Sequence, residues 1–111
     1  MRWLEGRLFA AQGLPSEALE RLSEVQRQLA GFKLPCDAAI VALEMAILHL
    51  EAGRTREVRV LAEEVVPVFE VEAIERERLG AVRLFVEAAR KEAATVAMAF
   101  NALEELRKGR G

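Results

Sequence analysis

The stretch that decides the fold is "AAIVALEMAIL", residues 38–48, near the middle of the chain. Glu44 is its only charged residue. A helix that is apolar nearly all round must be covered by protein on several sides. We therefore expect the segment from about Cys36 to Glu51 to form a helix at the centre of the fold, with other helices packed before and after it.

Prolines and glycines separate this segment from its neighbours. Pro35 and Pro15 each suit the first turn of a helix, where the missing N–H costs nothing. Gly13 and Gly53 suit the left-handed residue that ends a helix. Thr55 is expected to be the N-cap of the helix that follows Gly53, because its hydroxyl can accept a hydrogen bond from a free amide.

In the flanking segments, apolar residues recur every three or four positions. This spacing predicts amphipathic helices that each bury one stripe. The predicted stripes are Leu4, Leu8 and Ala11 in the first segment, Ala18, Leu22, Val25 and Leu29 in the second, and Val58, Leu61, Ala62 and Val65 in the fourth.

The last third of the chain offers fewer boundaries. Pro67 is expected to end the fourth helix near Val66, followed by one distorted turn, because proline is costly inside a helix. Residues 81–108 contain no glycine or proline, so they could form one long helix or two. A turn between Arg90 and Thr95, with Thr95 as N-cap, favours two helices.

Composition sets the class. The chain has 111 residues, of which 52% are hydrophobic and 31% charged, so it can bury one core and is not disordered. We predict a single all-α domain over residues 1–111, with about six helices in three antiparallel pairs near 2–30, 36–70 and 73–108. A net charge of −2 argues against nucleic-acid binding. No apolar run is long enough for a membrane span, so we expect a cytoplasmic protein without a membrane partner.

A similar sequence occurs before and after the central segment. "GLPSEALERLSEV" begins at Gly13 and "GRTREVRVLAEEV" begins at Gly53, 40 residues later. Each has glutamate at its fifth place and valine at its thirteenth. A period between 20 and 50 residues indicates stacked structural repeats.

The first repeat resembles a tetratricopeptide repeat (TPR). Trp3, Gly6, Phe9, Gly13 and Ala18 follow that family's run of aromatic, small, aromatic, glycine and alanine positions. The resemblance covers residues 2–30 well and residues 39–66 loosely, and it implies a short TPR-like α-solenoid. Arrays of HEAT-like or other helical hairpins also use periods near 40 and remain alternatives.

A TPR-like array implies a function. The first helices of successive pairs would line a concave, partly apolar groove that binds a segment of a protein or peptide partner, as in a non-catalytic interaction scaffold. Carried over by position, the groove residues would be Trp3, Arg7, Leu43, Ile47, Leu50, Arg83 and Glu87. The three aliphatic residues among them could equally belong to the core.

A structural role is the alternative. The chain would then be the C-terminal part of a longer bacterial regulatory or signalling protein. Its open N-terminal face, around Trp3 and Phe9, would dock on preceding repeats or on a second copy in a homodimer.

Catalysis is not expected, and neither is a cofactor or a metal. His49 and Cys36 are the only histidine and the only cysteine, thirteen residues apart. On one straight helix that separation is about 20 Å, which is too far for a catalytic dyad. A metal site would need several ligands of this kind.

Overall fold

The computed structural model describes residues 3–32, 34–70 and 79–110, and these residues form helices and short connections without any strand. The all-α class is therefore confirmed. The elements are α1 (Trp3–Ala11), α2 (Pro15–Gly31), α3 (Pro35–Glu51), α4 (Thr55–Val65), the 3₁₀ helix η1 (Val66–Glu70), α5 (Gly80–Arg90) and α6 (Val96–Arg110).

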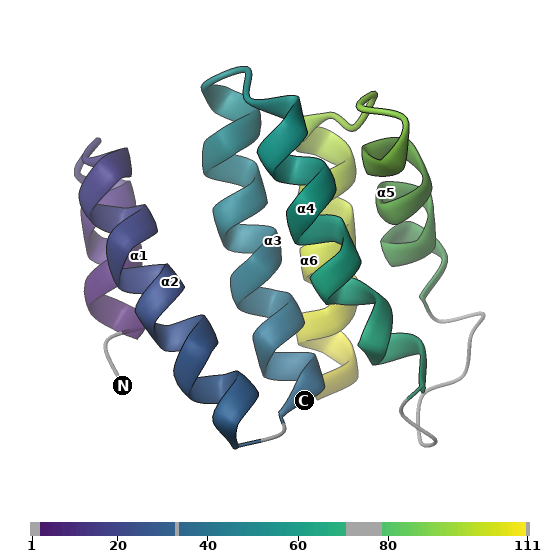
Figure 1. Ribbon diagram of the computed structural model, residues 1–111, viewed down its shortest axis with the longest axis horizontal. Helices are drawn as coiled ribbons and strands as arrows, with labels where there is room; N and C mark the ends of the chain where they lie inside the picture. Colours follow the sequence, from purple (N-terminus) through teal and green to yellow (C-terminus); the bar gives the residue numbers. More distant parts are fainter. Residues whose placement is uncertain (1–2, 33, 71–78, 111) are drawn as a thin grey trace.

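Helix α3 is the centre of the fold, as predicted. It packs against α2, α4, α6 and η1, and Figure 1 shows it between α2 on one side and α4 on the other. Nearly half of its residues are fully or almost fully buried. They are Ala39, Ile40, Val41, Ala42, Leu43, Met45, Ala46 and Ile47.

Each pair of helices is joined by a turn with the same hydrogen bonds. In the turn after α3, Gly53 has φ +74°, its N–H donates to the carbonyl of Leu50, and the N–H of Arg54 donates to the carbonyl of His49. This is the Schellman motif. Gly13, with φ +75°, forms the same turn after α1, so both glycine predictions are confirmed.

Prolines set the other boundaries as expected. Pro15 and Pro35 occupy the first turn of α2 and of α3. Helix α4 ends at Val65, and the segment containing Pro67 continues as η1, which is the predicted distorted turn. Val68 in η1 is fully buried, so this turn also contributes to the core.

The two threonine predictions differ in outcome. Thr95 caps α6, because its Oγ1 accepts a hydrogen bond from the N–H of Met98 at 3.2 Å. The last third thus forms two helices. Thr55 is not an N-cap: it is the first residue of α4, and Arg54 holds the cap position without a side-chain hydrogen bond. The Schellman turn places Gly53 and Arg54 before the helix, which moves Thr55 one residue inward.

The stripe predictions hold for α2 and α4, whose buried residues match the predicted ones. The prediction for α1 is wrong, since Leu4 and Leu8 are 77% and 56% exposed and Ala11 is exposed too. Gly6 is the residue that α1 buries. A Cβ at Gly6 would lie 3.0 Å from Leu22, so the small residue lets α1 approach α2 closely and turns the opposite face outward.

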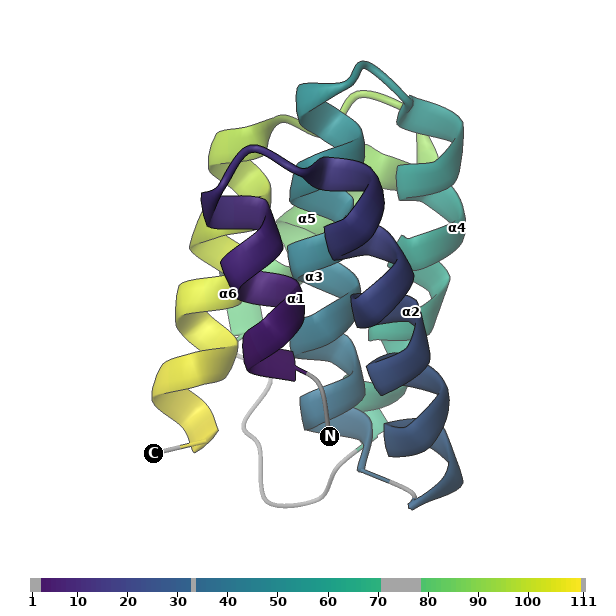
Figure 2. The same ribbon diagram turned by 90° about the vertical axis from the view of Figure 1, so that its left-hand side faces the viewer.

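The last two helices are placed in an unexpected order. Helix α6, the second of its pair, packs against α3, whereas α5 packs against α4 and α6. In Figure 2, which views the molecule from the side of α1, α6 lies in front of α5. The predicted start of the third pair at residue 73 lies outside the described residues.

Candidate functional site: the groove between α1 and α6

An open groove runs over α3 between α1 and α6. It encloses a volume of about 320 Å³. Helix α3 forms its floor, α1 and α6 form its walls, and Leu22 of α2 also lines it. The lining residues are Arg7, Ala10, Ala11, Leu22, Glu44, Ile47, Leu48, Glu51, Phe100, Leu103 and Arg107.

Glu44 lies in the floor, and three side chains from the walls donate hydrogen bonds to it. Arg7 reaches it from α1, with Nη2 2.7 Å from Oε1 and Nε 3.1 Å from the same oxygen. Trp3 Nε1 donates to Oε2 at 3.0 Å. Arg107 Nη2, from α6, lies 3.4 Å from Oε1. This cluster, here called the Glu44 cluster, joins the two walls through the floor.

The cluster satisfies a carboxylate that is nearly out of water. The Glu44 side chain is only 10% exposed, and a buried charge without partners would be strongly destabilising. Trp3 also helps to fix the Arg7 side chain, because the guanidinium carbon of Arg7 lies 4.6 Å from the centre of the indole ring, which is cation–π geometry. The side chains at this end of the groove are therefore held in place by one another.

The rest of the groove is largely apolar. Ile47 and Leu48 continue the floor, and Phe100 and Leu103 form the α6 wall. Phe100 is 50% exposed on this wall. Leu4 and Leu8 share a face of α1 with Ala11, which lines the groove, so exposed apolar surface continues from the groove onto the outside of α1.

Three of the predicted groove residues meet at this groove. Arg7 and Ile47 line it, and Trp3 lies against Arg7 and Glu44. Leu43 is fully buried and belongs to the core, so no partner can touch it. Leu50 is half-buried and packs against the core.

The structure does not bring Arg83 and Glu87 to the groove. Both are exposed on α5, which packs on α4 and α6. The expectation that first helices line the groove fails at the third pair, because α6 takes the place beside α3.

Sequence reasoning also missed Arg107 and Phe100 as wall residues. Their place depends on the order of α5 and α6 in space, for which the sequence carries no local signal. Glu44 did have a local sequence signal, because a single charge in an otherwise apolar helix requires a charged or hydrogen-bonding partner.

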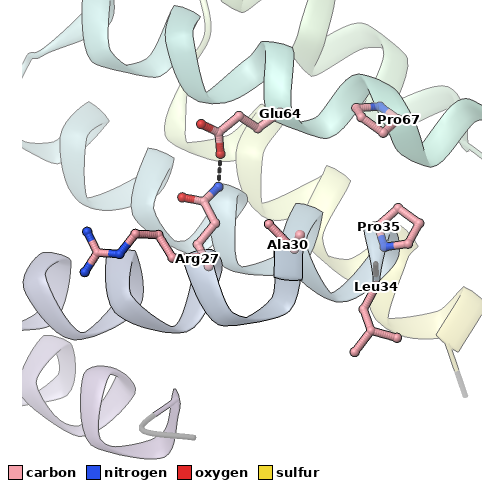
Figure 3. A pocket seen from close by; sticks show the side chains of 8 residues that line it. Arg27, Ala30, Leu34, Pro35, Glu64 and Pro67 are labelled. Carbon is pink, nitrogen blue, oxygen red and sulfur yellow. Dashed lines mark hydrogen bonds between the residues drawn. The ribbon is translucent and has the colours of Figure 1, made fainter. Parts of the chain in front are cut away.

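A second hollow lies between α2 and the end of α4, with a volume of about 680 Å³ (Figure 3). Pro35 and Pro67 stand on the same side of it, and Ala30 and Ala38 add further apolar surface. At the other end, the side-chain amide of Gln26 donates a hydrogen bond to Glu64, the residue labelled at the upper wall. Partial burial raises the pKa of Glu64. This hollow is mainly apolar, with Arg27 and the bridge between Gln26 and Glu64 as its polar side chains.

Other candidate chemistry is sparse in the described part of the chain. His49 Nδ1 accepts a hydrogen bond from Arg54 Nε at 2.9 Å, and burial, with the positive charge of Arg54, lowers the pKa of His49. Cys36 is half-buried at the start of α3. Within residues 3–32, 34–70 and 79–110, no three His, Cys, Asp or Glu side chains are grouped as metal ligands would be. None of the helices in those ranges combines the length and apolar character needed to cross a bilayer.

Comparison of the chain with family models, with curated proteins and with solved structures gave no match.

Proposed function

We propose that this protein is a non-catalytic interaction module that binds an amphipathic helix of a protein partner in the groove between α1 and α6. The observation that carries the proposal is the combination of an apolar lining, in which Ala11 and Phe100 are exposed, with the Glu44 cluster at one end. Apolar side chains of a bound helix would gain free energy by leaving water. The ordered cluster would fix the position of the helix along the groove.

The spacing of the floor residues favours a helix as the occupant. A bound helix offers apolar residues at positions i, i+3, i+4 and i+7 along one face. The floor residues Glu44, Ile47, Leu48 and Glu51 have the same spacing on α3. A helix lying along α3 would therefore meet a matching row of side chains.

The TPR resemblance supports the same proposal. Gly6 and Ala18 are the small positions of that pattern; both are buried, and Gly6 faces Leu22 of α2. The shared turns after α1 and α3 agree with a repeating hairpin. We propose a short TPR-like array, modified by the exchange of α6 for α5 beside α3.

The proposal is tested with a display library of amphipathic helical peptides. Selected peptides should lose at least tenfold in affinity for the Phe100→Asp variant, because a charge in an apolar wall must be desolvated on binding. Leu84→Asp is the matched control, since Leu84 is 54% exposed on α5, away from the groove. A library that yields no binder, or binders that Phe100→Asp leaves unaffected, would refute the proposal.

A second candidate is docking of α1 on preceding repeats or on a second copy. Exposed Leu4 and Leu8 favour it, although the open face is carried by these residues and not by Trp3 and Phe9. Trp3 is turned inward to Glu44. Light scattering would show a dimer at micromolar concentration that Leu4→Glu with Leu8→Glu abolishes. A monomer at all concentrations would exclude self-association through this face.

A further inference from the structure

We infer that the helix bound in the groove carries an acidic side chain and, seven residues away, a basic side chain, with apolar residues between them. This inference rests on the proposed function and specifies the chemistry of the partner. It follows from the distribution of charge along the groove.

One end of the groove has more cationic donors than its carboxylate uses. Arg7 and Arg107 approach Glu44 from opposite walls, and the Nη2 atoms of both contact the same oxygen, Oε1. Their side chains remain 38% and 44% exposed. A guanidinium has five N–H donors, so two guanidinium groups around one carboxylate have donors left for a second carboxylate.

Arg107 is the more available of the two arginines. Its contact with Glu44 is long, at 3.4 Å, and its other ion pair is with Glu104 at 3.9 Å. Glu104 is 60% exposed, and such a surface pair contributes little. A partner carboxylate over Glu44 could therefore take hydrogen bonds from Arg107 and Arg7 together, which is a strong arrangement for arginine.

The other end of the groove is negative. Glu51 lines it seven residues after Glu44, on the same face of α3. Seven residues are two helical turns, about 10 Å along the axis. The walls are uncharged at this end, where Ala11 and Phe100 line them, and carry Arg7 and Arg107 at the first end.

Apolar residues fill the space between the two charged ends. Leu48 is half-buried in the floor there, Ile47 beside it is 8% exposed, and Leu103, at 3% exposed, backs the wall. The complementary helix has one carboxylate for the arginines, one cation for Glu51, and aliphatic residues three and four positions from each. Because helices repeat a face every seven residues, both charges then point into the groove.

The probes for the test are designed helical peptides of about five turns, each with the same leucine stripe. One carries glutamate followed seven residues later by lysine, a second has the reverse order, and a third has glutamine at both positions. The two charged orders cover the two directions in which a helix can lie. Fluorescence anisotropy should show that one charged peptide binds roughly tenfold more tightly than the glutamine peptide, and that about 0.5 M salt reduces the difference.

Protein variants locate the two contacts. Glu51→Gln should weaken binding of the charged peptide and have little effect on binding of the glutamine peptide. Arg107→Gln should do the same at the other end of the groove. Glu87→Gln and Arg56→Gln are the matched controls, because both residues are exposed on other helices. Since Glu51 is exposed and its change leaves the core intact, loss of folding cannot explain its effect.

The outcomes separate the two proposals. Equal binding of all three peptides would overturn the charge inference and leave helix binding in place. Failure of every peptide and of the library would overturn both. Charge-dependent binding that Glu51→Gln and Arg107→Gln leave unchanged would also contradict the inference.

Discussion

Glu92 holds the position in the turn between α5 and α6 that Gly53 holds in the turn between α3 and α4. The N–H of Glu92 donates to the carbonyl of Ala89, and the N–H of Ala93 donates to that of Ala88, in the same Schellman pattern. The φ of Glu92 is +54°, and it is the only described residue other than glycine with a positive φ. The turn residues 13, 53 and 92 are thus spaced by 40 and 39 residues.

The first prediction is that Glu92→Gly stabilises the protein. A side chain in the left-handed region costs about 1 kcal/mol, which glycine avoids. The contacts of Glu92 with Thr55 and Arg59 are 3.5 Å long and exposed, so their loss costs little. Urea denaturation should show a gain of about 0.5–1 kcal/mol, and Gly53→Ala a loss of about 1 kcal/mol. A loss of stability in Glu92→Gly would show that the exposed contacts outweigh the backbone strain.

This turn also shows where sequence reasoning ends. Gly13 and Gly53 revealed a period because only glycine enters the left-handed region without cost. At residue 92 the backbone repeats but the glycine does not, so the third turn could be placed only by the cap at Thr95 and by the break in apolar spacing across residues 90–92. The central position of α3 followed from its apolar circumference. The burial of Gly6 in place of Leu4 and Leu8 could not be predicted from the sequence pattern, because it depends on how closely two helices approach.

Only part of the candidate site could likewise be predicted from the sequence. Trp3 and Arg7 could be placed at the groove because they lie in the repeat with the clearest pattern. Arg83 lies on α5 and Arg107 on α6, and the packing of α6 on α3 decides which of them reaches Glu44.

The second prediction concerns the close approach of α1 and α2. Gly6→Leu should destabilise the protein by about 1–3 kcal/mol, because a Cβ there already lies 3.0 Å from Leu22. Gly31→Leu is the control: it lies in α2 with nothing within 4 Å, and leucine favours the helix. Urea denaturation of both variants measures the difference, and equal effects would mean that α1 does not pack through Gly6.

The third prediction is that Glu44→Ala costs about 1.5–3 kcal/mol, the value of charged hydrogen bonds at a site shielded from water. Glu63→Ala removes a carboxylate that also binds an arginine, Arg90, at 2.7 Å, but Glu63 is 55% exposed. Its loss should cost no more than about 1 kcal/mol. Denaturation of both variants in about 0.1 M salt tests whether burial of the carboxylate, and not the ion pair alone, determines the cost.

The fourth prediction concerns the start of α5, which is capped from another helix. Glu105 on α6 accepts hydrogen bonds from the N–H groups of Ala81 and Val82, at 3.0 and 3.2 Å. Glu105→Ala should therefore cost about 0.5–2 kcal/mol, as the loss of an N-cap does. Glu104→Ala, one residue earlier and 60% exposed, should change stability by less than about 0.5 kcal/mol. If the two variants lose equal stability, Glu105 does not act as a cap.

The fifth prediction concerns the pH dependence of stability through His49. Its pKa is lowered from the ordinary value of 6.5, first by burial and then by the positive charge of Arg54, against an opposing effect of Glu57. The unfolded chain therefore binds a proton at His49 at higher pH than the folded chain does. The free energy of unfolding that this difference contributes is present above pH 6.5 and is lost as the pH falls below it, toward the folded pKa.

His49→Gln isolates this contribution. Urea denaturation at about pH 7.5 and about pH 5 should show a larger loss of stability for the unmodified protein than for the variant, because glutamine does not titrate. Glu64 acts in the opposite direction, since its raised pKa favours the folded state as the pH falls, but it is present in both proteins and cancels in the comparison. Parallel pH profiles for the two proteins would show that His49 takes up its proton equally well in the folded and unfolded chains.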